Sequence, residues 1–506
     1  MTENLRPTIK EKLLINLVED IFKVRPVLKE LFTEIPVINH LMPGLSWNPD
    51  PNNFPKRKCL EEIIIMETER LYGFKLAQDV SGQLTESWCV ETGAHLHIPR
   101  RFDRVTIQDS HDFTPIVSQG QIFVPILRKD FDHRLNISLN TGRVPPDNDN
   151  SGAFLDLPSL EKPLRLVPSR FDETPQTLIP AISASDLQKK RQQLETFLGQ
   201  KRITIDEFKL GCELLKNFEN HPDSFSDQAA TTHALVMDKT LTSLGVKQIT
   251  LDSEKIGVFF LRHLLKDKSS IIHEIFSNQN MLLSFINLFA DISTGWSSAL
   301  LKTGLKNSVF KDSVLFTRVD RSSKEPKTTN LGLIKENGQL FIGDKREFKL
   351  LLEPKAIEEA LSAGVIMPTG VLKFFSFLTE AGLCMIGGMN QAGYSTLIKE
   401  KACELLTQIG LVERAKALLV VPTQLIVISP SWGIVGNEEE ARPLDLMSVA
   451  INPLTREELL QISKINGRTA LTLSSLALGQ LFNIGTKLSV EDLLTIIDRN
   501  EVVVRS

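Results

Sequence analysis

The sequence predicts an α/β fold built on a mainly parallel sheet, and two observations point to it. Between residues 87 and 157, short apolar runs are separated by Gly, Pro, Asp and Asn, a pattern typical of buried strands. Elsewhere, segments with apolar residues at helical spacing alternate with further short apolar runs. Such alternation favours helices layered on a sheet, either a mixed sheet or a parallel one with short crossovers.

The expected helices carry apolar residues three and four positions apart. They cover Ile9–Phe32, Cys59–Leu71, a segment capped by Ser185, Ile205–Phe218, Asp227–Leu244, Asn280–Leu301, Lys355–Ser362 and Ser395–Ile409.

The expected strands are shorter and richer in branched apolar residues. They cover Trp88–Val90, Gln121–Leu127, Leu135–Leu139, Ala153–Leu157, Val246–Leu251, Ala417–Ser429 and the final run of three valines. The pair Asn337-Gly338 predicts a tight hairpin turn, because both residues tolerate a positive φ.

The chain has 506 residues, which exceeds the size of one ordinary domain. We expect an N-terminal helical arm and a C-terminal helical segment around an α/β core that a mainly helical region interrupts. The corresponding ranges are 1–80 for the arm, 81–180 for the first part of the core, 181–310 for the helical region, 311–435 for the second part of the core, and 436–506 for the C-terminal segment.

Composition argues against several classes of protein. The formal net charge of −4 argues against a general nucleic-acid binder, which needs a basic field, although a local basic patch stays possible. Five scattered cysteines without C-x-x-C spacing indicate reduced thiols. No signal peptide and no apolar run of the ~18 residues that span a bilayer are evident. We therefore expect a cytoplasmic protein with no membrane span.

The segment from Trp88 to Asp112 concentrates groups that move protons or hold anions. A turn at Thr92-Gly93 after a strand can aim backbone N–H groups at an anion, and Arg100 can clamp a phosphate or carboxylate. His95 and His97 point to the same side of an extended chain, so both can serve one substrate as proton donors.

Two other interpretations of this segment remain open. One histidine can simply cap a turn while the arginines lie in solvent. Alternatively, His95, His97, Asp109, His111 and Asp132-His133 supply the nitrogen and oxygen ligands that transition metals accept, although no motif fixes their geometry.

A second segment, Gly382 to Tyr394, carries a glycine pair followed by polar side chains. Gly387 and Gly388 allow a ligand or another element to approach the backbone closely. Asn390, Gln391 and Tyr394 can each donate and accept hydrogen bonds. The alternative is a glycine turn that only feeds the following helix.

Several landmarks resemble the bacillithiol-synthesis cysteine ligase family. They are VETGAHLHIP at Val90–Pro99, then VLFTRVD, ENGQLFIG, KAIEEALSAG, IMPTGVLKFF and IGGMNQAGY in the family's order. The resemblance covers about half of the chain, in pieces. Ala94-His95 replaces the Gln-Gln pair that follows Thr-Gly in the family. It implies a nucleotidyltransferase-like Rossmann core with a pocket near Thr92-Gly93.

These observations predict an enzyme that joins or transfers a small group, acting on a small charged metabolite. Thr92, Gly93 and Arg100 would bind the anion, and His95 and His97 would be catalytic. Gly387, Gly388, Asn390, Gln391 and Tyr394 would form the opposite wall. The alternatives are a metal-dependent enzyme using His95, His97 and His111, or a non-catalytic binding protein with an enzyme-like fold. Neither a cofactor nor an oligomeric state follows from the sequence.

Overall fold

The computed structural model describes most of the chain between residues 33 and 468, with gaps. The described residues are 29, 33–92, 123–130, 132–142, 154–171, 174–290, 292, 315–322, 325–344, 348–425, 432–435, 440–443, 446–468 and 503–504. The predicted helix Ile9–Phe32 therefore lies almost wholly outside them.

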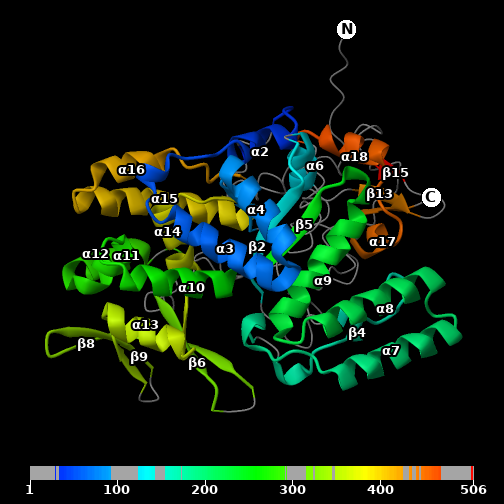
Figure 1. Cartoon of the computed structure of the whole chain (residues 1–506), viewed down its shortest axis with the longest axis horizontal. Helices are drawn as coiled ribbons and strands as arrows, with labels where there is room; N and C mark the ends of the chain where they lie inside the picture. Colours follow the sequence, from blue (N-terminus) through cyan, green and yellow to red (C-terminus); the bar gives the residue numbers. More distant parts are fainter. Residues whose placement is uncertain are drawn as a thin grey trace, which may run out of the picture.

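A four-stranded parallel sheet forms the centre of the molecule, which confirms the predicted α/β class (Figure 1). Its strands are β1 (Cys89–Glu91), β2 (Leu135–Asn140), β5 (Lys247–Asp252) and β12 (Cys384–Ile386). They lie in the order β12-β1-β2-β5, and all three neighbouring pairs are parallel. The two central strands are therefore β1 and β2.

The sheet has one apolar and one polar face. Along β2, the apolar side chains of Leu135, Ile137 and Leu139 alternate with those of Asn136 and Ser138, and all six residues of the strand are buried. β5 is paired with β2 in register and repeats the alternation. Since side chains of paired residues point to the same side, polar groups gather on one face.

Helices cover both faces (Figure 1). The apolar face packs against one core with the helices α3 (Arg57–Tyr72), α4 (Phe74–Glu86), α10 (Ser253–Lys266), α14 (Gly370–Ala381) and α15 (Met389–Gln408). The opposite face lies under α2 (Val37–Leu45), α6 (Phe123–Asp130) and α9 (Phe225–Thr240). This arrangement is a Rossmann-like three-layer sandwich.

The connections change face between β1 and β12. From β1 the chain passes to β2 and then to β5, with α6 and α9 on the polar face. β12 is reached through α10 and α14 and leads into α15, all on the apolar face. Adjacent strands whose connections leave on opposite sides form a topological switch point, where open α/β sheets bind their ligands.

The remaining elements surround this sandwich in three groups (Figure 1). A helical group holds α7 (Ala184–Gly199), α8 (Ile205–Asn220) and the short strands β3 (Phe154–Leu155) and β4 (Leu164–Arg165). An antiparallel group holds β6 (Phe316–Asp320), β7 (Lys327–Asn330), β8 (Gly332–Glu336), β9 (Gln339–Gly343), β10 (Lys349–Leu351), α13 (Pro354–Ser362) and β11 (Ile366–Pro368). A C-terminal group holds β13 (Trp432–Val435), β14 (Glu440–Pro443), α17 (Leu446–Ile451), α18 (Arg456–Ser463) and β15 (Val503–Val504).

Three further helices pack beside α10 and α15. They are α11 (Ile271–Ser277), α12 (Gln279–Phe289) and α16 (Val412–Leu419). The hairpin between β8 and β9 turns at Asn337 and Gly338, both at positive φ, as predicted. Among the described residues, none of the helices is long and apolar enough to cross a membrane.

Two predicted strands are wrong. The run Gln121–Leu127 belongs to a helix from Phe123 onward, because Pro125 has no N–H for a central ladder but fits the first turn of a helix. The run Ala417–Ser429 begins within the helix α16. Its residues Leu419 and Val420 are exposed, so this apolar run is not a buried strand.

Several helix boundaries also differ from prediction. Ser183, and not Ser185, caps α7 by accepting a hydrogen bond from the Asp186 N–H. The helix expected from Ser395 starts at Met389, so Asn390, Gln391 and Tyr394 lie on a helix and not on a turn. The predicted helix from Asn280 ends at Phe289, and residues 293–301 lie outside the described part.

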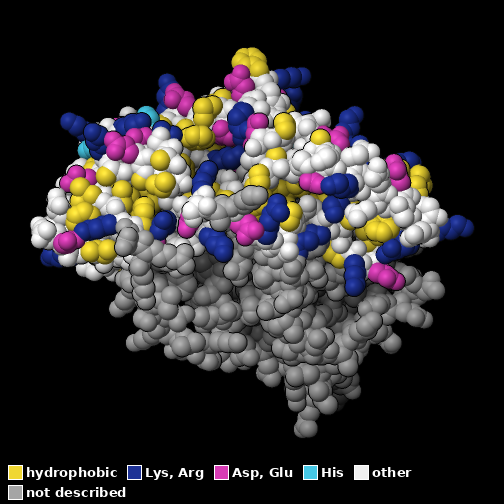
Figure 2. Space-filling model, turned by 90° about the horizontal axis from the view of Figure 1, so that it is seen from below, with side chains coloured by type: hydrophobic (Ala, Val, Ile, Leu, Met, Phe, Trp, Pro, Cys, Tyr) yellow, Lys and Arg dark blue, Asp and Glu magenta, His cyan; other side chains and the backbone are white. Residues whose placement is uncertain are grey.

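Charge is dispersed over the described surface. On the face shown in Figure 2, Lys and Arg side chains alternate with Asp and Glu side chains, with no extended area of one sign among the described residues. This distribution agrees with the small net charge of the chain.

Candidate functional site at the carboxyl edge of the sheet

Thr92 and Gln391, which are 299 positions apart in the chain, meet at the switch point. Thr92 follows β1, and its N–H donates to the carbonyl oxygen of Ile386 in β12 at 2.7 Å. The Gln391 amide donates through Nε2 to the Thr92 hydroxyl. The structure thus brings one residue from each predicted wall into contact, at the carboxyl ends of the two strands.

Gly387 makes this contact possible. A Cβ atom at this position would collide with the side chain of Gln391, so only glycine lets the amide lie over the end of β12. Gly388 is the N-cap of α15 and offers no side-chain hydrogen bond to the first turn. The N-terminus of a 20-residue helix therefore lies next to the Thr92–Gln391 contact without a side-chain cap.

Tyr394 lies on the same helix, one turn after Gln391. Its ring is partly buried and packs against Phe374, with ring centroids 5.4 Å apart. Burial raises the pKa of the phenol well above its usual range, so the hydroxyl stays protonated. Asn390 lies in the first turn of α15, and the structure describes only its backbone.

A buried ion pair lies on the same face of the sheet. Lys373 on α14 is 1% exposed, and its Nζ donates to Glu254 Oε1 at 2.6 Å and to Ser253 Oγ at 3.1 Å. Glu254 lies in the first turn of α10, two residues after β5, and also accepts a hydrogen bond from the hydroxyl of Thr141, the residue after β2, at 2.8 Å. Glu254 thus joins the carboxyl ends of β2 and β5 to α14.

These contacts connect into one arrangement along the sheet edge. Lys373 is followed in sequence by Phe374, whose ring contacts Tyr394 on α15. We call the set the carboxyl-edge site, and its members are Thr92, Thr141, Glu254, Lys373, Gln391 and Tyr394. It combines one buried cation, one carboxylate, hydroxyls and an amide beside a helix N-terminus, which together can bind and orient an anionic ligand.

The structure leaves several predicted residues untested. Gly93, His95, His97 and Arg100 lie outside the described residues, as does His111. Their roles remain predictions.

His133 from the same cluster is described and lies elsewhere. It is buried beside Arg128, whose guanidinium donates to the carbonyl oxygen of Cys89 at 2.7 Å. Burial, with the adjacent guanidinium, lowers the pKa of His133. A neutral imidazole packed against a buried cation is suited to a structural role. Among the described residues, no group of three or more His, Cys, Asp or Glu side chains could hold a metal ion.

Sequence reasoning missed Lys373, Glu254 and Thr141. Lys373 interrupts the apolar run from Val371 to Phe375 in α14, which is a usable signal, because a lysine is buried only when it is paired. Glu254 follows a strand and the capping residue Asp252, whose carboxylate accepts from the Glu254 N–H at 2.9 Å. No local pattern, however, shows that these two side chains meet.

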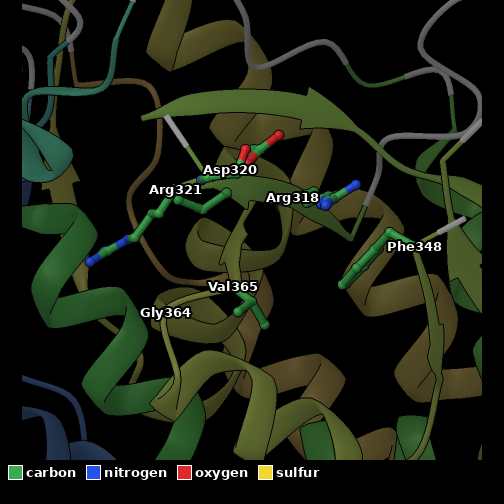
Figure 3. A pocket seen from close by; sticks show the side chains of 8 residues that line it. Arg318, Asp320, Arg321, Phe348, Gly364 and Val365 are labelled. Carbon is green, nitrogen blue, oxygen red and sulfur yellow. Dashed lines mark hydrogen bonds between the residues drawn. The ribbon is translucent and has the colours of Figure 1, made fainter. Parts of the chain in front are cut away.

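Two hollows of the described surface lie away from this edge. One, of about 240 Å³, is lined by residues of β6 with Phe348, Gly364 and Val365 (Figure 3). Its Arg318 is already paired with Asp344 at 2.7 Å. The other, of about 460 Å³, lies between α7 and α8, where Arg191 pairs with Glu219 at 3.1 Å. Neither combines unpaired buried polar groups, so we place the candidate site at the sheet edge.

No known family model matches the chain. A search of curated proteins likewise finds no match.

Proposed function

We propose that the chain is an enzyme that joins or transfers a small group, and that its substrate is a small charged metabolite held at the carboxyl-edge site. The main support is the Thr92–Gln391 contact, which lies at the switch point between β1 and β12. Rossmann-like sheets bind ligands in this crevice because loops diverge there and helix N-termini point at it.

The described residues have distinct proposed roles. The first turn of α15 offers backbone N–H groups to an anion, and Lys373 supplies positive charge. Two of the three N–H donors of Lys373 are taken by Glu254 and Ser253, so one stays available among the described residues. Thr92 and Gln391 hydrogen-bond the ligand and select it by shape.

His95 and His97 follow Thr92 by three and five positions in the sequence. We assign them the proton transfers of the reaction, with Arg100 as a second anion clamp. A general acid or base contributes ~10²-fold or more to a rate, so His95→Ala and His97→Ala should each lower turnover by that factor.

A non-catalytic binding protein is the second candidate. It is favoured by the position of Gln391, whose side chain covers Gly387 and fills the space directly above the strand end. Detection of turnover with any ligand that binds the site excludes this candidate. A metal-dependent reaction is tested separately, by elemental analysis of the purified chain.

Binding is the first experiment. Wild-type protein is titrated calorimetrically with ATP, with sugar phosphates and with amino acids, and the same titrations are run on Thr92→Val and Thr85→Val. Thr85 is an exposed threonine on α4 whose hydroxyl donates to the Ser81 carbonyl oxygen of the same helix, and it serves as a matched control. We expect at least one anionic probe to bind the wild type and the control equally. Thr92→Val should bind it at least tenfold more weakly, and equal binding by all three proteins would place the ligand elsewhere.

A further inference from the structure

A set of buried polar groups lies at the same edge of the sheet, on the face opposite Lys373. Asn140 ends β2, Asp252 ends β5, and Gln176 begins the 3-10 helix η7 (Gln176–Leu178). Their relative exposures are 0%, 4% and 0%, so all three are withdrawn from solvent. We call this set the polar niche.

Asn140 and Asp252 are neighbours on the sheet, and Gln176 lies beside Gly142, two residues after Asn140. Asn140 and Asp252 are register partners on adjacent parallel strands, so their side chains leave the sheet on the same face. The Gln176 N–H donates to the carbonyl oxygen of Gly142 at 2.9 Å, and a Cβ on Gly142 would lie 3.0 Å from the Gln176 amide nitrogen. η7 packs against α9, the helix that covers this face.

Each residue keeps unused hydrogen-bonding atoms. Asn140 Oδ1 accepts from Ser138 at 2.7 Å, but its Nδ2 has no partner within the described part of the chain. Asp252 Oδ1 accepts from the Glu254 N–H, whereas its Oδ2 has no partner of hydrogen-bonding geometry there. Both polar atoms of the Gln176 amide are likewise unpaired among these residues.

Buried polar atoms without partners destabilise a fold, and native proteins hold few of them without a reason such as water or a ligand. Burial also raises the pKa of Asp252, an effect that Lys255 and Ser226 nearby oppose. Three such residues lie together at the carboxyl edge of the sheet, beside a candidate ligand site. We therefore infer that their unpaired atoms bind a ligand.

The unused atoms identify the chemistry of the ligand. Asn140 offers a donor, Asp252 an acceptor, and Gln176 one of each. A hydroxyl group both donates and accepts, so two adjacent hydroxyls match this set, whereas a phosphate would be repelled by the carboxylate.

We propose that the polar niche binds the vicinal hydroxyls of a ribose, so that the ligand of the carboxyl-edge site is a nucleotide. This inference rests on the proposed function, since it assumes an anion near the start of α15. The niche lies two to three strand positions from β12, which corresponds to roughly 10–14 Å. A ribose joined to a polyphosphate chain covers a distance of this order, while a single sugar phosphate is shorter.

The test compares ATP with 2′,3′-dideoxy-ATP, which lacks only the two hydroxyls. Both are titrated into wild-type protein, Gln176→Met and the matched control Gln193→Met, which changes an exposed glutamine on α7. We expect the wild type and the control to bind ATP at least tenfold more tightly than the dideoxy analogue. Gln176→Met should lose this preference while its melting temperature stays equal or rises, because an unpaired buried amide has been replaced by an apolar group of similar size.

The outcomes separate the two proposals. Equal binding of both nucleotides to the wild type overturns the niche while leaving an anion site at the carboxyl edge. A preference for ATP that survives in Gln176→Met, together with a lower melting temperature, shows that the amide is structural and also overturns the niche. If neither nucleotide binds, the inference fails, and the proposed function is then decided by the sugar phosphates and amino acids.

Discussion

Lys373 Nζ lies 2.6 Å from Glu254 Oε1, and this ion pair joins α14 to α10 at the edge of the sheet. The lysine reaches the carboxylate because α10 carries Gly257 at the crossing. A Cβ on Gly257 would lie 2.9 Å from Cγ of Lys373, so a larger residue would displace the lysine stem. One glycine on α10 therefore positions a cation on another helix.

Lys373→Met should destabilise the protein because it leaves the Glu254 carboxylate without its partner in a largely buried place. Removing one member of a buried pair typically costs about 3 kcal/mol or more in free energy of unfolding. The measurement is urea denaturation at neutral pH.

The double variant Lys373→Met with Glu254→Gln is the matched control, since it removes both charges and retains most of the side-chain volume. It should recover most of the lost stability but not ligand binding. If Lys373→Met alone were as stable as the wild type, water would already solvate the Lys373–Glu254 pair.

Gly387→Ala should break the Thr92–Gln391 contact, because the new methyl group takes the space of the Gln391 side chain. The side chain can move, so we expect a modest loss of about 1 kcal/mol. In the Gln391→Ala background the two nearest atoms are gone and only the Cβ, 2.8 Å away, remains, so part of this cost should disappear. Additive effects of the two changes in chemical denaturation would contradict the geometry.

The sheet was predictable in part. Leu135–Leu139 and Val246–Leu251 are predicted as strands from their branched apolar residues and correspond to β2 and β5, although the polar residues of these strands are buried as well. The order of strands was not predictable, since β1 pairs with β12 through contacts such as Cys89 with Cys384, and no local pattern encodes a partner so far along the chain. The prediction of a strand at Gln121–Leu127 is wrong because Pro125 cannot donate a hydrogen bond to a central strand ladder.

The candidate site, like the sheet, could be predicted from the sequence only in part. The glycine pair and the polar residues after it predict a binding role for Gln391, and the turn after β1 predicts one for Thr92. That these two touch agrees with the expectation that both segments lie together, while their role in binding remains a prediction. Lys373 and Glu254 meet only through a helix crossing, which is a tertiary feature without a sequence motif.

His233 on α9 should make the fold sensitive to acid. It is buried against Thr250, with Nδ1 3.1 Å from the hydroxyl, and burial lowers its pKa to about 4. An unfolded histidine titrates near ~6.5, so the unfolded state binds more protons between these values. Stability contributed by the neutral imidazole is therefore full above pH ~6.5 and declines as the pH falls toward 4, by about 3 kcal/mol in total.

The variant His233→Gln keeps a polar partner for Thr250 but cannot take up this proton. Its free energy of unfolding, measured in urea from pH 4 to 8, should vary less with pH than that of the wild type. His263→Gln changes an exposed histidine on α10 and provides the control. Identical slopes for wild type and His233→Gln would show that the imidazole is not buried neutral.

Asp238, further along α9, should change the pH dependence of stability in the direction opposite to His233. Burial raises its pKa to about 6, and its carboxylate accepts a hydrogen bond from the Gln248 N–H at the start of β5. The folded state binds this proton more tightly than the unfolded state, so stability falls as the pH rises from ~4 to ~6. The ionised carboxylate then destabilises the fold at every higher pH, by an amount on the order of 2 kcal/mol.

Asp238→Asn retains the acceptor for the Gln248 N–H and removes the buried charge. At pH 8 we expect it to be more stable than the wild type by about 1–2 kcal/mol, and at pH 4 to be nearly equal to it. Asp79→Asn, at an exposed position of α4, should change neither value. Because His233 and Asp238 act in opposite directions between pH 4 and 6, the wild-type profile partly conceals both. The two single variants should therefore diverge in this window, His233→Gln gaining stability at its acidic end and Asp238→Asn at its neutral end.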